Sequence, residues 1–152
     1  MSIEARLTEL GITLPQAAAP VASYQPIVIA GETAYISGQL PFVDGKLVTG
    51  KLGAAVTLEQ GQQAARACGL MIIAQLKAAG LLERVAQVVK LGGFVASTPD
   101  FSDQPKVVNG TSDLMFEVFG DAGLHARSAV GVPVLPLDAA VEVDAIVAIR
   151  PA

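Results

Sequence analysis

The sequence predicts an α+β fold in which two helices pack on one face of a sheet, with the element order β-β-α-β-α-β-β. Two observations support this prediction. Strand-like runs rich in β-branched and aromatic residues are interrupted by only two long stretches of helical periodicity. The first of these stretches has a single apolar face, the pattern of a helix that covers one side of a sheet. At 152 residues and without internal repeats, the chain is expected to form one domain over residues 1–152.

Residues 1–20 predict a short helix followed by an extended arm. Ile3, Leu7 and Leu10 are apolar at helical spacing, and Gly11 is suited to end the helix. Residues 14–20 contain two prolines and several alanines, which favours an extended connector. We expect this arm to pack against the domain, and a free linker is the alternative.

Two strands are expected after the arm, over Tyr24 to Ala30 and Thr33 to Ser37. Gly31-Glu32 lies between them and is compatible with a two-residue hairpin turn. Pro26 lacks an N–H group, so the start of the first strand is expected at a sheet edge. Asp44-Gly45 marks a second turn.

A long helix is predicted between Thr57 and Gly80. Thr57 can cap its first turn, with Gln60 placed to complete a capping box, and Gly80 can end it. The predicted apolar face consists of Ala64, Ala65, Cys68, Met71, Ile72 and Leu76.

The rest of the chain predicts a strand, a helix and two further strands. The strand covers residues 85–97, and the helix begins near Gln104-Pro105, where proline is tolerated, and ends at Gly120. The two final strands are expected over residues 126–133 and 140–149. These final strands show little alternation of polar and apolar residues, so the face without helices is also expected to be apolar and to be covered by other subunits.

Composition narrows the range of functions. Hydrophobic residues make up 52% of the chain, and the net charge is −4, which disfavours nucleic acid as a partner. The longest apolar run, over residues 67–74, is too short to cross a membrane. The N-terminal sequence does not resemble a secretory signal, so we expect a cytoplasmic protein. Cys68 is the only cysteine, which excludes an internal disulfide and a cysteine-based zinc site, and we expect it to fill the core.

Signatures of nucleotide, zinc and serine-hydrolase sites are missing from the sequence. His125 is the only histidine, and its place before a strand suggests a solvated or capping residue at a site rim. Arg127 lies among small and apolar residues, so its guanidinium needs an anionic partner, either in an internal or intersubunit salt bridge or in a ligand carboxylate. Glu142 poses a similar question, because partial burial can raise its pKa and suit it to move a proton, while a structural role is nearly as plausible. Strand alternation places Asp144 on the same side as Glu142, and Asp144 is interpreted as structural.

Five segments together resemble the Rid/YjgF family, also called endoribonuclease L-PSP-like. The resemblance runs from about residue 21 to Ile149 and includes spacing as well as residue type. The extra N-terminal helix indicates a divergent branch. The matching segments are Tyr24, Tyr35 to Pro41 (YISGQLP), Val108 to Gly110 (VNG), Ala126 to Val130 (ARSAV), and Leu135-Pro136 followed by Val141 to Val143 (VEV).

This resemblance implies a chorismate-mutase-like fold, a homotrimer and three clefts between neighbouring subunits. The implied activity is hydrolysis of reactive 2-imino or 2-enamino acids to 2-keto acids and ammonia, without a cofactor or metal. By the same resemblance, Arg127 grips the substrate carboxylate and Glu142 lies near the attacking water. Tyr24, Ser37, Gly38 and Asn109 are implied to line the cleft. The alternatives are a turn residue for Ser37 and a polar helix face for Asn109.

One position departs from the family pattern. Deaminating members commonly carry a cysteine two residues after the arginine, where this chain has Ala129. Ala129 is still expected to offer backbone polar groups to the ligand. The substitution keeps an alternative open, a non-catalytic trimer that binds small carboxylates or acts like a chaperone. A ribonuclease is the weaker alternative, because the chain is acidic and has one histidine.

Overall fold

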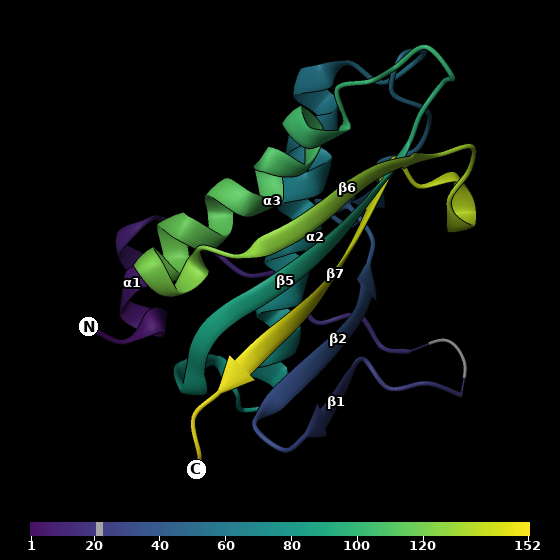
Figure 1. Ribbon diagram of the computed structural model, residues 1–152. Coiled ribbons are helices and arrows are strands. Elements are labelled where there is room, and N and C mark those ends of the chain that lie inside the picture. Colours follow the sequence, from purple (N-terminus) through teal and green to yellow (C-terminus); the bar gives the residue numbers. More distant parts are fainter. Residues whose placement is uncertain (21–22) are drawn as a thin grey trace.

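Five strands form the main sheet, in the order β1-β2-β7-β5-β6 (Figure 1). The computed structural model describes residues 1–20 and 23–152. Neighbouring strands run antiparallel except β5 and β6, which are parallel. The strands are β1 (Ile27–Ala30), β2 (Thr33–Gln39), β5 (Val85–Ala96), β6 (Ala126–Val132) and β7 (Val141–Ile149).

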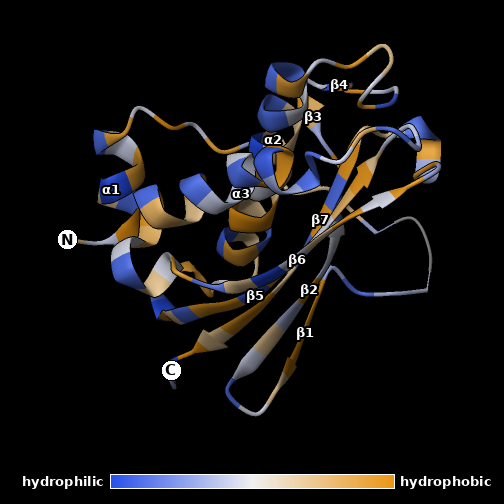
Figure 2. Cartoon of the chain, turned by 45° about the horizontal axis from the view of Figure 1, so that its top comes forward, coloured by the Kyte–Doolittle hydropathy of each residue, from blue (hydrophilic) through white to orange (hydrophobic). Residues whose placement is uncertain are grey.

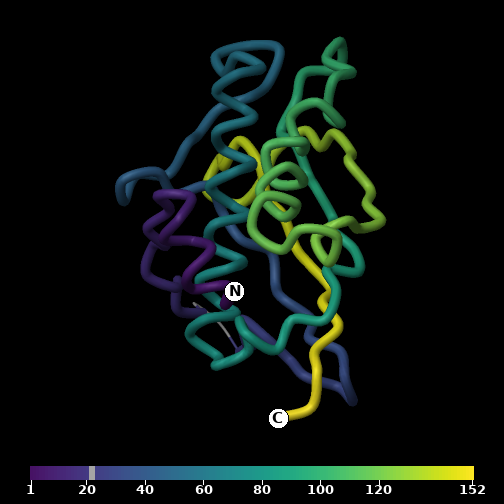
Figure 3. The backbone as a smooth tube through the Cα atoms, turned by 90° about the vertical axis from the view of Figure 1, so that its left-hand side faces the viewer, coloured from purple at the N-terminus to yellow at the C-terminus, as the bar shows by residue number. Residues whose placement is uncertain are grey.

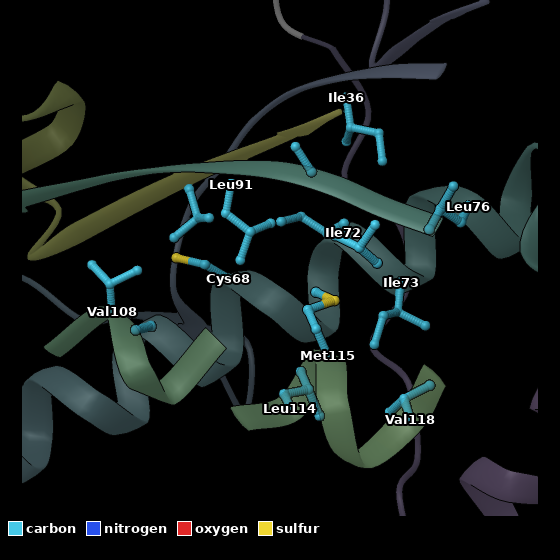
Figure 4. Packing of buried hydrophobic residues seen from close by; sticks show 14 of the residues in the cluster. Ile36, Cys68, Ile72, Ile73, Leu76, Leu91, Val108, Leu114, Met115 and Val118 are labelled. Carbon is cyan, nitrogen blue, oxygen red and sulfur yellow. The ribbon is translucent and has the colours of Figure 1, made fainter. Parts of the chain in front are cut away.

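Two long helices cover one face of this sheet, which confirms the predicted α+β fold. Helix α2 (Leu58–Ala78) packs mainly on β7 and β2, and α3 (Gln104–Phe119) packs on β5 and β6. Thr57 and Gln60 form the predicted capping box, and Gly80 follows the end of α2 with a φ of 71°. Buried side chains from both helices and from the sheet meet in one core, in which Cys68 is fully buried (Figure 4).

The N-terminal segment packs against the helices, as predicted. Helix α1 (Ile3–Glu9) contacts α3, and Leu7 on its inner face is buried. The Glu83 carboxylate accepts hydrogen bonds from the backbone of Ile3 at 2.8 Å and Glu4 at 3.0 Å, so it caps the start of α1. The following arm lies along α2 (Figure 3), where the Gln75 amide donates to the backbone oxygen of Ala18 at 2.8 Å.

The structure differs from the predicted elements in three places. Strand β2 ends at Gln39 and not at Ser37. The first strand begins at Ile27 and not at Tyr24, because Pro26 has no N–H group to continue the ladder. The second turn, at Asp44-Gly45, forms its own hairpin between β3 (Phe42–Val43) and β4 (Lys46–Leu47). Short 3₁₀ turns are η1 (Leu82–Arg84), η2 (Gly120–Gly123) and η3 (Pro136–Asp138).

The other face of the sheet carries no helix. Along β7, buried residues that face the helices alternate with partly exposed residues on the open face. Val28, Tyr35 and Val130 also lie exposed on the sheet, and β1 is coloured almost entirely hydrophobic in Figure 2. The open face therefore has the apolar surface expected for a subunit contact, interrupted by charged residues of β7. Within residues 1–20 and 23–152, no helix combines the length and the apolar content needed to cross a bilayer.

Candidate functional site

Arg127 projects from β6 toward the helix layer. Its neighbour on β5 in the sheet register is Leu91, which is fully buried in the core between sheet and helices. Directly paired residues of neighbouring strands point to the same face, so Arg127 also points to the helix face. There it lies at the sheet edge beside α3, because β6 is the last strand of the sheet.

Three hydrogen-bond acceptors surround the Arg127 guanidinium, and none of its partners in the described chain is a carboxylate. Nη1 donates to Asn109 Oδ1 at 2.9 Å and to Ser112 Oγ at 3.0 Å, and Nη2 donates to the backbone oxygen of Pro105 at 3.1 Å. The ion pairs among the described residues do not include Arg127. The Nε–H and the second Nη2 hydrogen have no acceptor among those residues, so two donors of one guanidinium are free for a ligand.

Ser112 and His125 extend this network and were not identified as site residues from the sequence. His125 Nε2 lies 2.8 Å from Ser112 Oγ, and His125 Nδ1 lies 2.6 Å from the backbone oxygen of Gly123. His125 is half-buried with both ring nitrogens engaged, and its bond to Gly123 at the end of η2 fits the capping alternative and not the solvated one. The spacing of Ser112 from Asn109, three residues along a helix, is the signal that could have located it.

Glu142 projects from the opposite face of the sheet. Its neighbours along β7, Val141 and Val143, are fully buried toward the helices, so Glu142 points to the open face. Burial raises the pKa of the Glu142 carboxyl, and the Asp144 carboxylate two residues along the same face raises it further. Burial also raises the pKa of Asp144, opposed by a hydrogen bond from the Gly92 backbone and by the nearby Lys90.

Gly38 lies beside Glu142, and the neighbouring Ser37 contacts the loop that carries Tyr24. A side chain on Gly38 would collide with Glu142 Oε1, so the glycine leaves the space that the carboxylate occupies. The Ser37 hydroxyl donates to the backbone oxygen of Gln25 at 2.8 Å, which ties the Tyr24 loop to β2. Tyr24 itself is exposed to 47%.

The predicted site residues thus form two clusters. The arginine cluster consists of Arg127, Asn109 and Ala129, where Ala129 pairs with Gly93 on the helix face and contacts the core. The glutamate cluster consists of Glu142, Gly38, Ser37 and Tyr24. Because β5 separates β6 from β7 and the two key side chains leave opposite faces, one chain does not bring the clusters to one ligand.

A groove of about 810 Å³ lies elsewhere, between the N-terminal arm, the β3–β4 hairpin and α2. None of the predicted site residues lines it. Among the described residues, no group of three or more histidine, cysteine, aspartate or glutamate side chains is placed to hold a metal ion. The arginine cluster offers a guanidinium and an amide, which suit the binding of a small carboxylate, and the glutamate cluster offers a carboxyl group with a raised pKa, which suits proton transfer.

Comparison with known proteins connects this geometry to a family. Residues 4–148 match the model of the family described as "YjgF/chorismate_mutase-like, putative endoribonuclease". The protein TCP17 of Trypanosoma cruzi is 53% identical over 95% of this chain and 92% of its own length. A 2-iminobutanoate/2-iminopropanoate deaminase of Dermatophagoides farinae is 33% identical, with 91% of this chain and 95% of the relative covered.

A solved structure from Agrobacterium tumefaciens, of a protein with unknown function, is also similar. It superposes with a TM-score of 0.90 at 50% sequence identity, covering 97% of this chain and 92% of that one. The similarity therefore extends through the N-terminal helix and arm as well as the sheet.

Proposed function

This chain belongs to the YjgF/chorismate mutase-like family, and from that premise we propose that it hydrolyses reactive 2-imino and 2-enamino acids to 2-keto acids and ammonia. The name of the Dermatophagoides farinae relative supports this reaction class. The reaction takes place in a cleft between neighbouring subunits of a homotrimer and consumes only the substrate and water.

The observation that carries the proposal is that Arg127 has only neutral hydrogen-bond partners in the described chain. A buried or half-buried guanidinium normally pairs with a carboxylate, yet every partner of Arg127 in the described chain is neutral. Its position is fixed by three hydrogen bonds while two donors stay free. This arrangement suits a ligand carboxylate, which would complete the charge pair and accept both remaining hydrogens.

The need for a second subunit follows from the separation of the two clusters. A 2-imino acid carries its carboxylate directly beside the C=N carbon, so the anchor and the proton-transfer group must approach it within a few ångströms of each other. Arg127 and Glu142 of one chain leave opposite faces of the sheet. A cleft between the arginine cluster of one subunit and the glutamate cluster of its neighbour supplies both groups, and the exposed apolar residues of the sheet provide contact surface.

Within such a cleft the chemistry requires one acid-base group. Water attacks the imine carbon while the Glu142 carboxylate takes one of its protons, and Glu142 passes this proton to the nitrogen to give a carbinolamine. Glu142 then takes the hydroxyl proton of the carbinolamine and passes it to the nitrogen as the C–N bond breaks and the C=O bond forms, releasing ammonia. The raised pKa of Glu142 suits it to hold and return a proton within one turnover.

Ala129 favours a second candidate function, a non-catalytic trimer that binds small carboxylates. The position two residues after the arginine commonly holds a cysteine in deaminating members of the family. β6 is an edge strand, so its outer backbone groups can still bind a ligand without a thiol side chain at this position. Binding of 2-ketobutyrate without turnover of any imino acid would favour this second function.

A ribonuclease activity, which the family description names, has less support. The net charge of −4 opposes binding to a phosphate backbone. His125, the only histidine, has both ring nitrogens engaged by Ser112 and Gly123, so it is not free to act as a base.

The direct test is the rate of 2-ketobutyrate formation from freshly generated 2-iminobutyrate. Wild-type protein should accelerate it over the spontaneous reaction, and Arg127→Ala should not. Arg66→Ala is the matched control, since Arg66 is also partly exposed but lies on α2 and pairs with Glu117. No acceleration by the wild type, or equal rates for wild type and Arg127→Ala, would refute the proposal.

A further inference from the structure

A directional hydrogen-bond chain runs from Arg127 through Ser112 and His125 to Gly123. The backbone oxygen of Gly123 can only accept, so His125 Nδ1, at 2.6 Å, must carry the hydrogen that it donates. In the neutral imidazole, Nε2 is then the acceptor, and the Ser112 hydroxyl donates to it at 2.8 Å. The lone pairs of Ser112 Oγ are left to accept from Arg127 Nη1 at 3.0 Å.

Each hydrogen atom in this series of hydrogen bonds has one acceptor. The bonds therefore fix the orientation of the side chains as well as the distances between them. The Ser112 hydroxyl cannot rotate without losing its bond to His125, and Arg127 cannot turn its Nη1 edge without losing Ser112 and Asn109. The guanidinium plane is thereby held in the orientation in which Nε–H and one Nη2 hydrogen remain free. His125 is anchored in turn by Gly123, a residue of η2 that is buried.

We propose that Ser112 and His125 are positioning residues that hold the Arg127 guanidinium in its carboxylate-binding orientation. The proposal rests on the proposed function only in naming the ligand as a small 2-imino or 2-keto carboxylate. Neither residue touches the reacting atoms, so their loss weakens binding of the carboxylate more than it slows the chemical step. A guanidinium held before the ligand arrives loses less conformational freedom on binding, which is the source of the affinity.

The chain offers variants that separate this role from general stability. Ser112→Ala removes the hydroxyl, whereas Ser112→Thr keeps it. His125→Phe removes the acceptor, whereas His125→Gln places an amide oxygen near the position of Nε2. Ser102→Ala is the matched control, because Ser102 is an exposed serine in the loop before α3.

The experiment combines calorimetric binding of 2-ketobutyrate with kinetics on 2-iminobutyrate. Ser112→Ala and His125→Phe should weaken binding and raise KM by about tenfold, the scale of one hydrogen bond to a charged group, with little change in kcat. Ser112→Thr, His125→Gln and Ser102→Ala should stay near wild type. If the wild type binds and turns over substrate but Ser112→Ala and His125→Phe match it, the positioning role is refuted while the proposed function stands.

A measurement on the ligand-free protein distinguishes the positioning role of Ser112 and His125 from the proposed deaminase function. Nitrogen NMR of the free protein should show His125 protonated at Nδ1 and restricted rotation of the Arg127 guanidinium. Ser112→Ala should release that rotation, and Ser112→Thr should preserve it. If the wild type turned over no imino acid, this result would still support the positioning role. Free rotation in the wild type, or restricted rotation that survives Ser112→Ala, would overturn it.

Discussion

Arg127 and Glu142 project from opposite faces of the same five-stranded sheet. Arg127 pairs with the buried Leu91 and donates to Asn109 and Ser112 of α3, whereas Glu142 alternates with the buried Val141 and Val143. The relationship follows from strand register and does not depend on how either side chain rotates. A ligand that contacts both groups must therefore lie between two copies of the chain.

Glu142→Gln should lower kcat by about a hundredfold or more, the scale of a lost general acid-base group. The amide keeps the size of the side chain but cannot take a proton from water. Because burial and Asp144 raise the pKa of Glu142, wild-type kcat should fall as the pH decreases through that raised pKa. A pH profile of kcat checks both effects, and an unchanged acidic limb in Glu142→Gln would contradict the assigned role.

Asp144→Asn should raise stability near neutral pH and shift the acidic limb of kcat to lower pH. The folded pKa of Asp144 is raised, so the folded state binds its proton more tightly than the unfolded chain does. The contribution of this group to stability is therefore present at low pH and lost as the pH rises through the folded pKa. Removing the negative charge also lowers the pKa of Glu142.

Thermal melting of Asp144→Asn measures the effect on stability at neutral pH and at a pH below the ordinary pKa range of carboxyl groups. Asp113→Asn, at an exposed position of α3, is the matched control. The gain in Tm should be larger at neutral pH than at low pH for Asp144→Asn. An equal gain in Tm at both pH values would contradict the link between the ionisation of Asp144 and stability.

Gly38→Ala should reduce turnover by displacing Glu142. The added methyl group would occupy the place of Glu142 Oε1, so either the carboxylate or β2 must move. A misplaced catalytic group commonly costs on the order of a hundredfold in rate. Gly31→Asn is the control, because Gly31 lies in open space at a positive φ of 61° that asparagine tolerates. Full activity of Gly38→Ala would argue against Glu142 as the proton-transfer group.

Glu83→Gln should loosen α1 without affecting turnover. The Glu83 carboxylate accepts from the backbone of Ile3 and Glu4, and the amide offers only one oxygen to these two donors. At this exposed position we expect a loss of about 1 kcal/mol in the free energy of unfolding. Hydrogen exchange at residues 3–9 should become faster, and urea unfolding measures the stability change. A loss of turnover in a folded Glu83→Gln protein would instead link α1 to the active site.

The sequence predicted the elements well where local signals were strong. The capping box at Thr57 and the glycines after α1, α2 and α3 mark boundaries that the structure reproduces. Alternation within one strand also placed Glu142 and Asp144 on the same face. The sequence could not show that Arg127 and Glu142 point to opposite faces. That relationship depends on the register of β5 between their two strands.

The Ser112–His125 network could not be predicted from the sequence for a similar reason. Ser112 belongs to a helix and His125 precedes a strand, and only the packing of α3 over β6 brings them within hydrogen-bonding distance. A lone histidine beside a strand has no periodicity that reveals its partner.

Complementation between two inactive variants tests the shared cleft most directly. Arg127→Ala and Glu142→Gln each lack one group, so every cleft in a pure preparation of either variant is defective. When the two are unfolded together and reassembled at equal amounts, about a quarter of the clefts in a random cyclic assembly receive an intact Arg127 from one subunit and an intact Glu142 from its neighbour. The account predicts that the mixture regains about a quarter of wild-type deaminase activity, on the same statistical basis. A mixture that stays as inactive as its two components, despite forming mixed assemblies, would contradict it.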